Sequence, residues 1–194
     1  MTTPPGSTDR LMALDLPLPD PLPEAVAELF SKCQAKLGLI PNVLVAYAHR
    51  PEKLQAFSLM YNDLMLGPSG LSKLEREMIA VAVSAENRCW YCQVAHGAQL
   101  RQISGDPALG EALVMNWHAA DLDPRQRAMI DFALRMTRES AAIGDAEREV
   151  LRGHGLSDTD IWDIAAVASF FNMSNRMASA VGMEPNPDYH AMAR

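Results

Sequence analysis

The sequence predicts an all-α fold of antiparallel helical hairpins, and two observations carry that prediction. Apolar residues recur at helical spacing from Pro23 to about Val181, and no run of β-branched residues alternates with period two. Prolines stand where helices begin and glycines where they end, as at Pro51 and Gly38. With 194 residues, 48% of them hydrophobic, the chain can bury one core. We therefore expect a single helical domain over residues 24–194.

A proline-rich segment, residues 1–23, precedes this domain. From Leu14 to Pro23, prolines alternate with apolar residues. Proline lacks an N–H group and biases the residue before it towards extended backbone, so the segment is not helical. We expect a disordered tail over residues 1–10 and an ordered extended arm over residues 11–23. This arm is expected to pack on the body or on a neighbouring subunit.

After Pro23, helical spacing and helix start and stop residues predict a series of helices with short breaks. Their expected bounds are 24–37, 41–49, 51–66, 72–86, 89–103, 107–119, 124–140, 145–153 and 157–181.

Two of these segments resemble each other. Residues 71–87 match residues 156–172 without a gap at a constant offset of 85 (156 minus 71), and leucine, serine, isoleucine, alanine, serine and asparagine recur in place. Chance gives roughly one identity in such a window, so we predict an internal duplication. The second copy carries Ser174 where the first carries Cys89, which indicates that one half kept the thiols and the other became scaffold.

Charge and hydropathy limit the partners. The formal net charge of −7 argues against a surface that grips phosphate backbones or an anionic membrane. The first residues lack a basic region followed by an apolar one, and the longest apolar stretches fall far short of the roughly 20 residues that span a bilayer. We expect a cytoplasmic protein that binds neither nucleic acid nor membrane.

The chain has three cysteines, and two of them form a Cys-x-x-Cys motif. An odd number in a reducing compartment argues against a structural disulfide framework. Cys89, Cys92 and His96 are spaced so that all three project from one face of a helix. Asn87 is a good capping residue just before them, and a helix N-terminus stabilises a thiolate. The motif therefore predicts a reactive dithiol with a nearby base.

Glu77 is the carboxylate expected to orient that base. On one continuous helix it would lie about 18 Å from Cys89, too far to cooperate. If the chain turns near Asn87 into an antiparallel hairpin, Glu77 comes opposite His96 and holds the imidazole in one tautomer. The alternative is a solvated residue on the helix surface, because Glu75 and Arg76 beside it are ordinary surface types.

These residues also allow interpretations in which the cysteines are not catalytic. Cys89, Cys92, His96 and Glu77 could together ligate a structural zinc ion. Trp90 and Tyr91 are expected to pack at the helix start. Cys33 is interpreted as a small buried hydrophobe without a catalytic role.

Glu77 followed by Cys89-x-x-Cys92-x-x-x-His96 resembles the alkylhydroperoxidase D branch of the carboxymuconolactone decarboxylase superfamily. The residues from Val83 to Gly97 look like its uncharacterised peroxidase-related members. The motif lies within residues 71–104, and the resemblance extends loosely over residues 40–181. The resemblance implies an all-α fold and a homo-oligomer.

The resemblance also implies roles. Cys92 would attack the peroxide and become a sulfenic acid, Cys89 would condense with it to a disulfide, and His96 with Glu77 would relay protons. One departure is Tyr91, where the best-studied branch has a further histidine between the cysteines; slower turnover or a different substrate follows from it. The lactone-decarboxylating branch generally lacks the cysteine pair, which argues against that activity.

The predicted function is therefore a thiol-dependent peroxidase that reduces alkyl hydroperoxides and needs no metal, flavin or haem. Its partners are a small hydroperoxide substrate and an external thiol or dithiol reductant. Two alternatives use the same cysteines: a zinc-binding structural protein, and a non-enzymatic redox sensor whose disulfide changes its oligomeric state.

Overall fold

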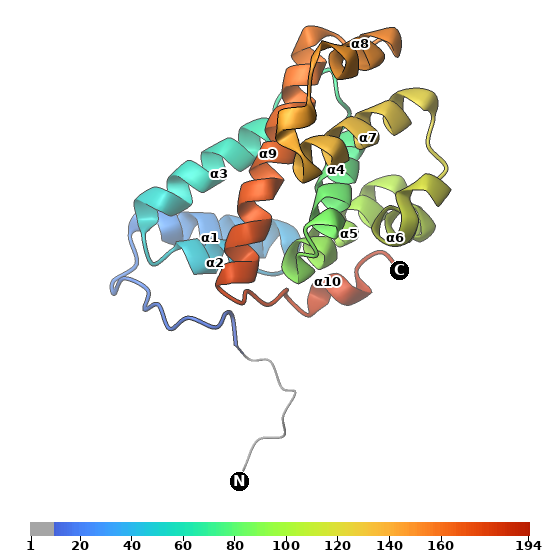
Figure 1. Cartoon of the computed structure of the whole chain (residues 1–194). Coiled ribbons are helices and arrows are strands. Elements are labelled where there is room, and N and C mark those ends of the chain that lie inside the picture. The colour runs from blue at the N-terminus through green and yellow to red at the C-terminus, as the bar shows by residue number, and fades with distance from the viewer. Residues whose placement is uncertain (1–9) are drawn as a thin grey trace.

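The computed structural model describes residues 10–194, and every regular element in that part of the chain is a helix (Figure 1). The α-helices are α1 (Glu24–Leu37), α2 (Asn42–Tyr47), α3 (Pro51–Leu66), α4 (Lys73–Glu86), α5 (Trp90–Ser104), α6 (Pro107–Asn116), α7 (Pro124–Arg138), α8 (Asp145–Gly153), α9 (Asp158–Ala180) and α10 (Asp188–Ala191). Two short 3₁₀ helices, η1 (Trp117–Ala119) and η2 (Ser140–Ala142), follow α6 and α7. The predicted all-α fold is confirmed.

The predicted helices differ from the observed ones mainly at their ends. Helix α2 ends at Tyr47, two residues early. The predicted helix over residues 107–119 divides into α6 and η1, and the one over 124–140 into α7 and η2. The four-residue α10 was not predicted, because so short a helix shows no apolar period.

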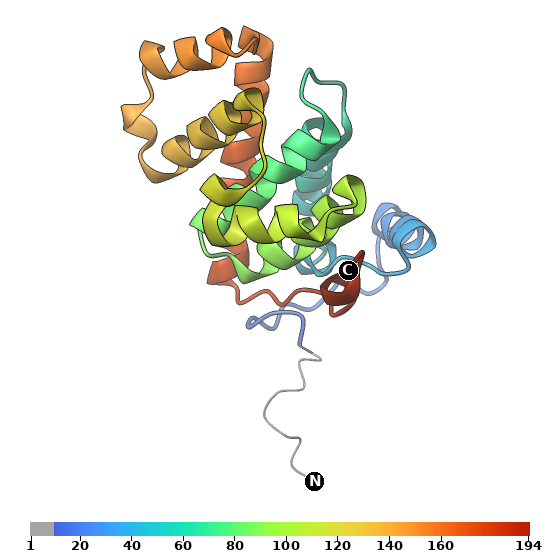
Figure 2. The same ribbon diagram turned by 90° about the vertical axis from the view of Figure 1, so that its right-hand side faces the viewer.

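Helix α4 is the centre of the core. Ten consecutive residues, from Glu75 to Ser84, are buried, and the helix packs against α5, α6, α7 and α9. Figure 2 shows α8 and α1 at opposite ends of the molecule, away from this centre. Polar side chains on such a helix are shielded from water and need hydrogen-bond partners within the protein. Glu77 is one of these buried polar residues.

Glu75 and Arg76 are buried, so the expectation that they are ordinary surface residues is wrong. The Glu75 carboxylate closes a capping box with Ser72 at the start of α4 and also pairs with Arg125. The Arg76 guanidinium donates to the carbonyl oxygens of Leu64 at 3.1 Å and Gly67 at 2.9 Å. Arg125 compensates the charge of Glu75, whereas Arg76 is held by the two carbonyl oxygens alone, and its buried Nε has no hydrogen-bond partner among the described residues.

The N-terminal segment contacts the body at its first described residues. Ala13 N–H donates to the Val181 carbonyl at 2.8 Å, Glu184 N–H donates to the Leu11 carbonyl at 3.0 Å, and Met12 is buried. Leucines further along, at 14, 16, 18 and 22, are exposed. Packing of this stretch on a neighbouring subunit stays a prediction, as does the boundary at residue 23. The expected tail of residues 1–10 lies outside the described residues except for Arg10.

The two similar segments begin in the same way and end differently. Ser72 and Ser157 each cap a helix by accepting from the amide three residues on, Glu75 and Asp160 respectively. After Asn87 the first segment leaves the helix, whereas the second continues as α9 to Ala180. The shared caps agree with an internal duplication, which stays a prediction.

Candidate active site

The break between α4 and α5 places Cys89 at a helix N-terminus. Arg88 takes a left-handed conformation with φ 53°, and the chain then re-enters a helix at Trp90. Cys89 is the N-cap residue, and its amide donates to the Ser84 carbonyl at 2.9 Å. Cys89 therefore lies beside the unpaired N–H groups of the first turn of α5, which favour a negative charge, and the Cys92 amide contributes to lowering the pKa of its thiol.

Both thiols of the motif are free and buried. Cys89 is 1% exposed and Cys92 is 2% exposed. The pKa of Cys89 is lowered to about 6, chiefly because its sulfur accepts a hydrogen bond from the Cys92 thiol, and contacts with Ser179 and His96 add to the effect. The pKa of Cys92 is raised, since the adjacent Cys89 thiolate and burial both oppose a second charge. The pair thus holds one thiolate at neutral pH.

The predicted contact between Glu77 and His96 is confirmed. Nδ1 of His96 on α5 lies 2.8 Å from Oε2 of Glu77 on α4, and Glu77 is only 6% exposed. The alternative of a solvated surface glutamate is therefore wrong. A carboxylate can only accept this hydrogen bond, so Nδ1 is the donor, and in the neutral imidazole Nε2 is then the acceptor.

Aromatic rings hold the imidazole from the sides. The ring of Phe171 meets His96 edge to face, with centroids 4.6 Å apart, and Tyr61 lies 6.3 Å away. Packed rings limit rotation of the imidazole and exclude water from the Glu77 contact. Orientation by the carboxylate and confinement by the rings act on the same side chain.

A buried amide network lies where α4, α5 and α9 meet. Asn87 Nδ2 donates to Asn175 Oδ1 at 2.9 Å and to Asn172 Oδ1 at 3.1 Å, and Asn175 Nδ2 donates to Ser84 Oγ at 3.0 Å. Asn175 also hydrogen-bonds to the side chain of Cys92, and this contact lowers the thiol's pKa against the larger opposing effects. The second similar segment therefore supplies polar partners to the thiol site.

A cavity of about 450 Å³ opens beside Cys92 and His96. Its walls come from α1, α2, α3, α5 and α9, with one residue from α10. Most of its lining is apolar or aromatic, as at Val43, Phe57 and Phe170. Cavities of this size and character commonly hold organic ligands. Cys92 is on the cavity wall, whereas Cys89 is not, so substrate in the cavity would meet Cys92 first.

The residues between the two cysteines take different places. Tyr91 is buried as expected, and its hydroxyl accepts a hydrogen bond from the Val43 amide at 3.1 Å. Trp90 packs at the helix start only in part, because its ring lies against His190 while 55% of the residue is exposed. As the first residue of α5, Trp90 directs its side chain outward, towards the C-terminal segment that carries His190.

Cys33 lies on the cavity wall, which its sequence context did not reveal. It is half-buried on α1, and desolvation raises the pKa of its thiol. Lys32, Lys36 and Tyr189 also reach the cavity. These residues come from α1 and α10, far from the motif in sequence, so no local spacing could have grouped them with it.

No group of three or more histidine, cysteine, aspartate or glutamate side chains is arranged to hold a metal ion within residues 10–194. The four residues considered as zinc ligands are thus not gathered around one point. In the same described part of the chain, none of the helices combines the length and apolar character needed to cross a lipid bilayer.

A helical bundle with a Cys-x-x-Cys pair at a helix break, next to a glutamate–histidine contact, defines a class of dithiol proteins. The model of the carboxymuconolactone decarboxylase family matches residues 51–108. A crystal structure of an uncharacterized peroxidase-related protein from Silicibacter sp. TM1040 is 62% identical, with 98% of this chain and 100% of that chain covered and a TM-score of 0.95.

A second solved structure, described as an alkylhydroperoxidase AhpD core and uncharacterized peroxidase-related protein from Ralstonia eutropha JMP134, is 44% identical. The alignment covers 95% of this chain and 97% of that one, with a TM-score of 0.92. The debrominase Bmp8 shares the fold at 17% identity, with 95% and 96% covered and a TM-score of 0.75. No protein with a curated description matched. The chain belongs to the alkylhydroperoxidase D-like group of the carboxymuconolactone decarboxylase superfamily.

Proposed function

We propose that this protein is a thiol-dependent peroxidase that reduces alkyl hydroperoxides through a dithiol–disulfide cycle of Cys92 and Cys89. The observation that carries the proposal is the joint placement of the thiol pair and the Glu77–His96 contact beside an apolar cavity. Membership of a family with peroxidase-related proteins supports the same reaction class.

The first step is attack by Cys92. His96 Nε2 takes the Cys92 proton, which the raised pKa of that thiol makes necessary. The thiolate sulfur then bonds to one peroxide oxygen, the O–O bond breaks, and the departing alkoxide receives the proton from His96 to become an alcohol. The sulfur is oxidised to a sulfenic acid, and the peroxide gains two electrons.

The second step is resolution by Cys89. Because the pKa of Cys89 is lowered to about 6, its sulfur is a thiolate at neutral pH and needs no further base. It attacks the Cys92 sulfur, the S–S bond forms, the S–O bond breaks, and the hydroxide that leaves takes a proton from solvent to become water. The lowered pKa of Cys89 is therefore consistent with Cys89 as the resolving thiol and Cys92 as the attacking thiol.

An external thiol or dithiol then reduces the disulfide and completes the cycle. A cytoplasmic location would supply such a reductant. We further propose a homo-oligomer, in which the exposed leucines of residues 14–22 meet a neighbouring subunit. A non-enzymatic redox sensor is the remaining alternative, since it would form the same disulfide without turnover.

The test is a stoichiometric oxidation of reduced protein carrying Cys33→Ala, so that only the pair can react. One equivalent of cumene hydroperoxide should remove two hydrogens and form one Cys89–Cys92 disulfide, detected by mass spectrometry. With Cys89→Ser added, dimedone should trap a sulfenic acid on Cys92; with Cys92→Ser added, no adduct should form.

If a dimedone adduct formed equally fast on Cys89 in the Cys92→Ser protein, Cys89 could attack the peroxide by itself, and the assignment of that role to Cys92 would be wrong. Disulfide formation without any catalytic turnover when dithiothreitol is present would select the sensor. Absence of oxidation in the parent protein would end both interpretations.

A further inference from the structure

The cavity beside Cys92 is much larger than hydrogen peroxide requires. Its volume is about 450 Å³, whereas a water molecule takes about 30 Å³ in the liquid. Val43, Leu44, Phe57 and Phe170 give it an apolar and aromatic wall. Burial of apolar substrate surface against such a wall is favourable, at about 25 cal/mol per Å². The wall therefore fits a substrate with a sizeable hydrocarbon body.

The charges around this cavity are all of one sign. Lys32 and Lys36 line it from α1, one helical turn apart and on the same face, and no aspartate or glutamate is among its lining residues. These are two of only four lysines in a chain with a net charge of −7. A cationic edge on an otherwise acidic protein indicates attraction of an anionic group.

Neither ammonium group is held firmly by the protein. Lys32 contacts Glu28 at 3.1 Å, but both side chains are more than half exposed, and such pairs contribute little. Among residues 10–194, no carboxylate forms an ion pair with Lys36. Both lysines are thus available to a ligand carboxylate.

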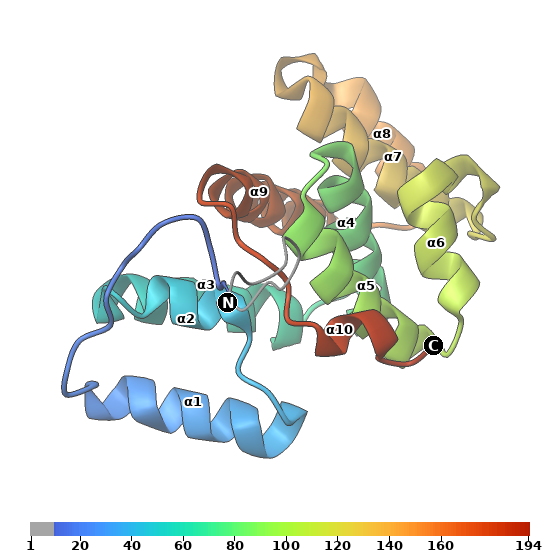
Figure 3. The ribbon, with the colours of Figure 1, turned by 90° about the horizontal axis from the view of Figure 1, so that it is seen from below.

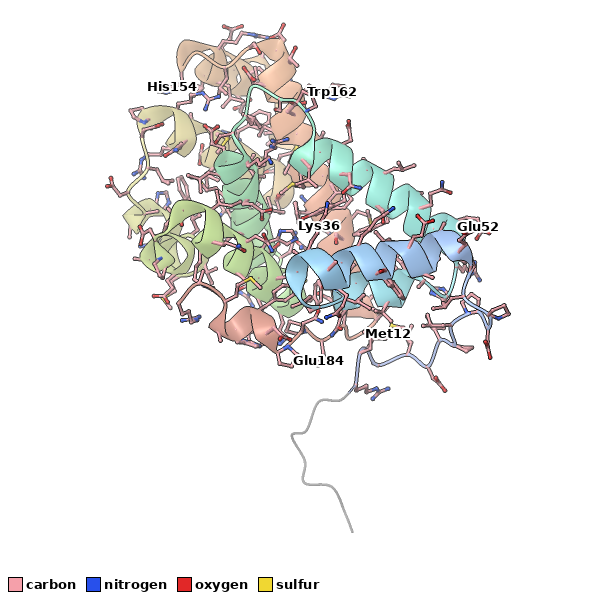
Figure 4. The ribbon with its side chains drawn as sticks, turned by 180° about the vertical axis from the view of Figure 1, so that it is seen from behind. Met12, Lys36, Glu52, His154, Trp162 and Glu184 are labelled. Carbon is pink, nitrogen blue, oxygen red and sulfur yellow. The ribbon has the colours of Figure 1, made fainter. Side chains whose placement is uncertain are left out.

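Helix α1 carries these lysines at the outer side of the cavity. Val26 is its one buried residue in the described structure, and Figure 3 shows α1 at the edge of the molecule, apart from α4 and α5. In Figure 4, α1 lies across the near side, with Lys36 labelled towards its C-terminal end. The thiol and the histidine reach the same cavity from α5, which lies apart from α1 in Figure 3, so one extended ligand in the cavity could contact both the lysines and the thiol.

We propose that the cavity takes amphipathic hydroperoxides, with the apolar body against its aromatic wall, a carboxylate at Lys32 and Lys36, and the peroxide group at Cys92 and His96. This inference rests on the proposed peroxidase for its reaction, but the carboxylate site can be tested without turnover. The class of substrate is a fatty-acid hydroperoxide rather than hydrogen peroxide.

The test compares linoleic acid hydroperoxide with its methyl ester, which removes only the charge. Wild type should show a kcat/KM about three- to tenfold higher for the acid, the effect of two partly exposed charge pairs. In Lys32→Gln/Lys36→Gln, the ratio should fall to about one. The matched control, Lys53→Gln/Lys73→Gln, changes the net charge equally at two exposed lysines outside the cavity and should keep the ratio. Equal rates for acid and ester in wild type, or an unchanged ratio in the cavity variant, would overturn the inference.

Binding of unoxidised linoleate, measured by calorimetry on the same three proteins, separates the two proposals. Linoleate affinity that depends on Lys32 and Lys36, with no peroxide turnover by any protein, supports the carboxylate site and ends the peroxidase. Turnover of cumene hydroperoxide with linoleate affinity indifferent to both lysines leaves the peroxidase standing and ends the carboxylate site.

Discussion

The two similar segments share a beginning and differ at their ends, and that difference produces the thiol site. Both start with a serine capping box, and their asparagines, Asn87 and Asn172, lie within hydrogen-bonding distance of each other at 3.1 Å. After Asn87 the chain breaks at Arg88 and starts a new helix. After Asn172 it continues as one helix. A break creates a helix N-terminus that stabilises a thiolate, and a continuous helix has none at that place.

The side chains follow the same division. At the 85-residue offset, Glu77, Cys89, Cys92 and His96 correspond to Trp162, Ser174, Met177 and Val181. Asn175 on α9 nevertheless reaches across to the thiol site. One segment supplies the proposed chemistry and the other supplies support, so substitutions at matched positions should have very different effects.

The largest contrast is expected at Glu77 and Trp162. Glu77→Gln removes the carboxylate that orients His96, so peroxide turnover should fall by about 10²-fold. Trp162→Gln changes a side chain that is 75% exposed and should leave turnover within about twofold. Steady-state kinetics on both variants, with circular dichroism as a check on folding, measures the contrast. Equal activity of the two variants would remove Glu77 from the relay.

The next contrast concerns ionisation. Because the pKa of Cys89 is lowered to about 6, its thiolate is present above that pH and is protonated as the pH falls through it. In reduced protein carrying Cys33→Ala, thiolate ultraviolet absorbance should fall with a midpoint near pH 6. Below it, the thiolate fraction should drop about tenfold per pH unit. Cys89→Ser, which places at the break the residue found at Ser174, should lose this transition. A midpoint near the ordinary value of about 8.5 would mean that the hydrogen bonds from Cys92 do not stabilise the Cys89 thiolate.

The smallest expected contrast is in the free energy of unfolding. A glycine substitution should raise it in the first segment and lower it in the second. Arg88 is exposed and holds a positive φ, which costs a non-glycine residue about 1–2 kcal/mol. Arg88→Gly should therefore raise the free energy of unfolding by up to about 1 kcal/mol, after the greater entropy of the unfolded glycine chain offsets part of the gain. At the matched position inside α9, Met173→Gly should lower it by about 1 kcal/mol or more.

Urea unfolding of both glycine variants measures this pair of effects. A loss of stability in Arg88→Gly as large as that in Met173→Gly would mean that the left-handed residue is not strained.

Local patterns predicted much of this fold. Prolines, capping serines and apolar spacing set the starts of α3, α4 and α9, because these features act within one or two turns. The contact of Glu77 with His96 was predictable as well, since equal distances from a turn bring residues of a hairpin together. Both predictions depend on short stretches of chain.

Contacts between distant segments were not predictable in this way. Lys36 and Cys33 reach the cavity because the fold brings α1 and α5 to the walls of one cavity, which no local spacing records. Asn175 meets the thiol site through the packing of α9 on α4. Trp90 lies outward because the C-terminal segment, with His190, runs past the start of α5. Such contacts depend on how whole helices pack.

The most direct test of the peroxidase is steady-state consumption of cumene hydroperoxide with dithiothreitol as reductant. Wild type, Cys92→Ser and the matched Met177→Leu protein are assayed side by side. The account predicts turnover by wild type and Met177→Leu and only the background rate for Cys92→Ser, because the attacking sulfur is gone. Turnover by Cys92→Ser at the wild-type rate would contradict it.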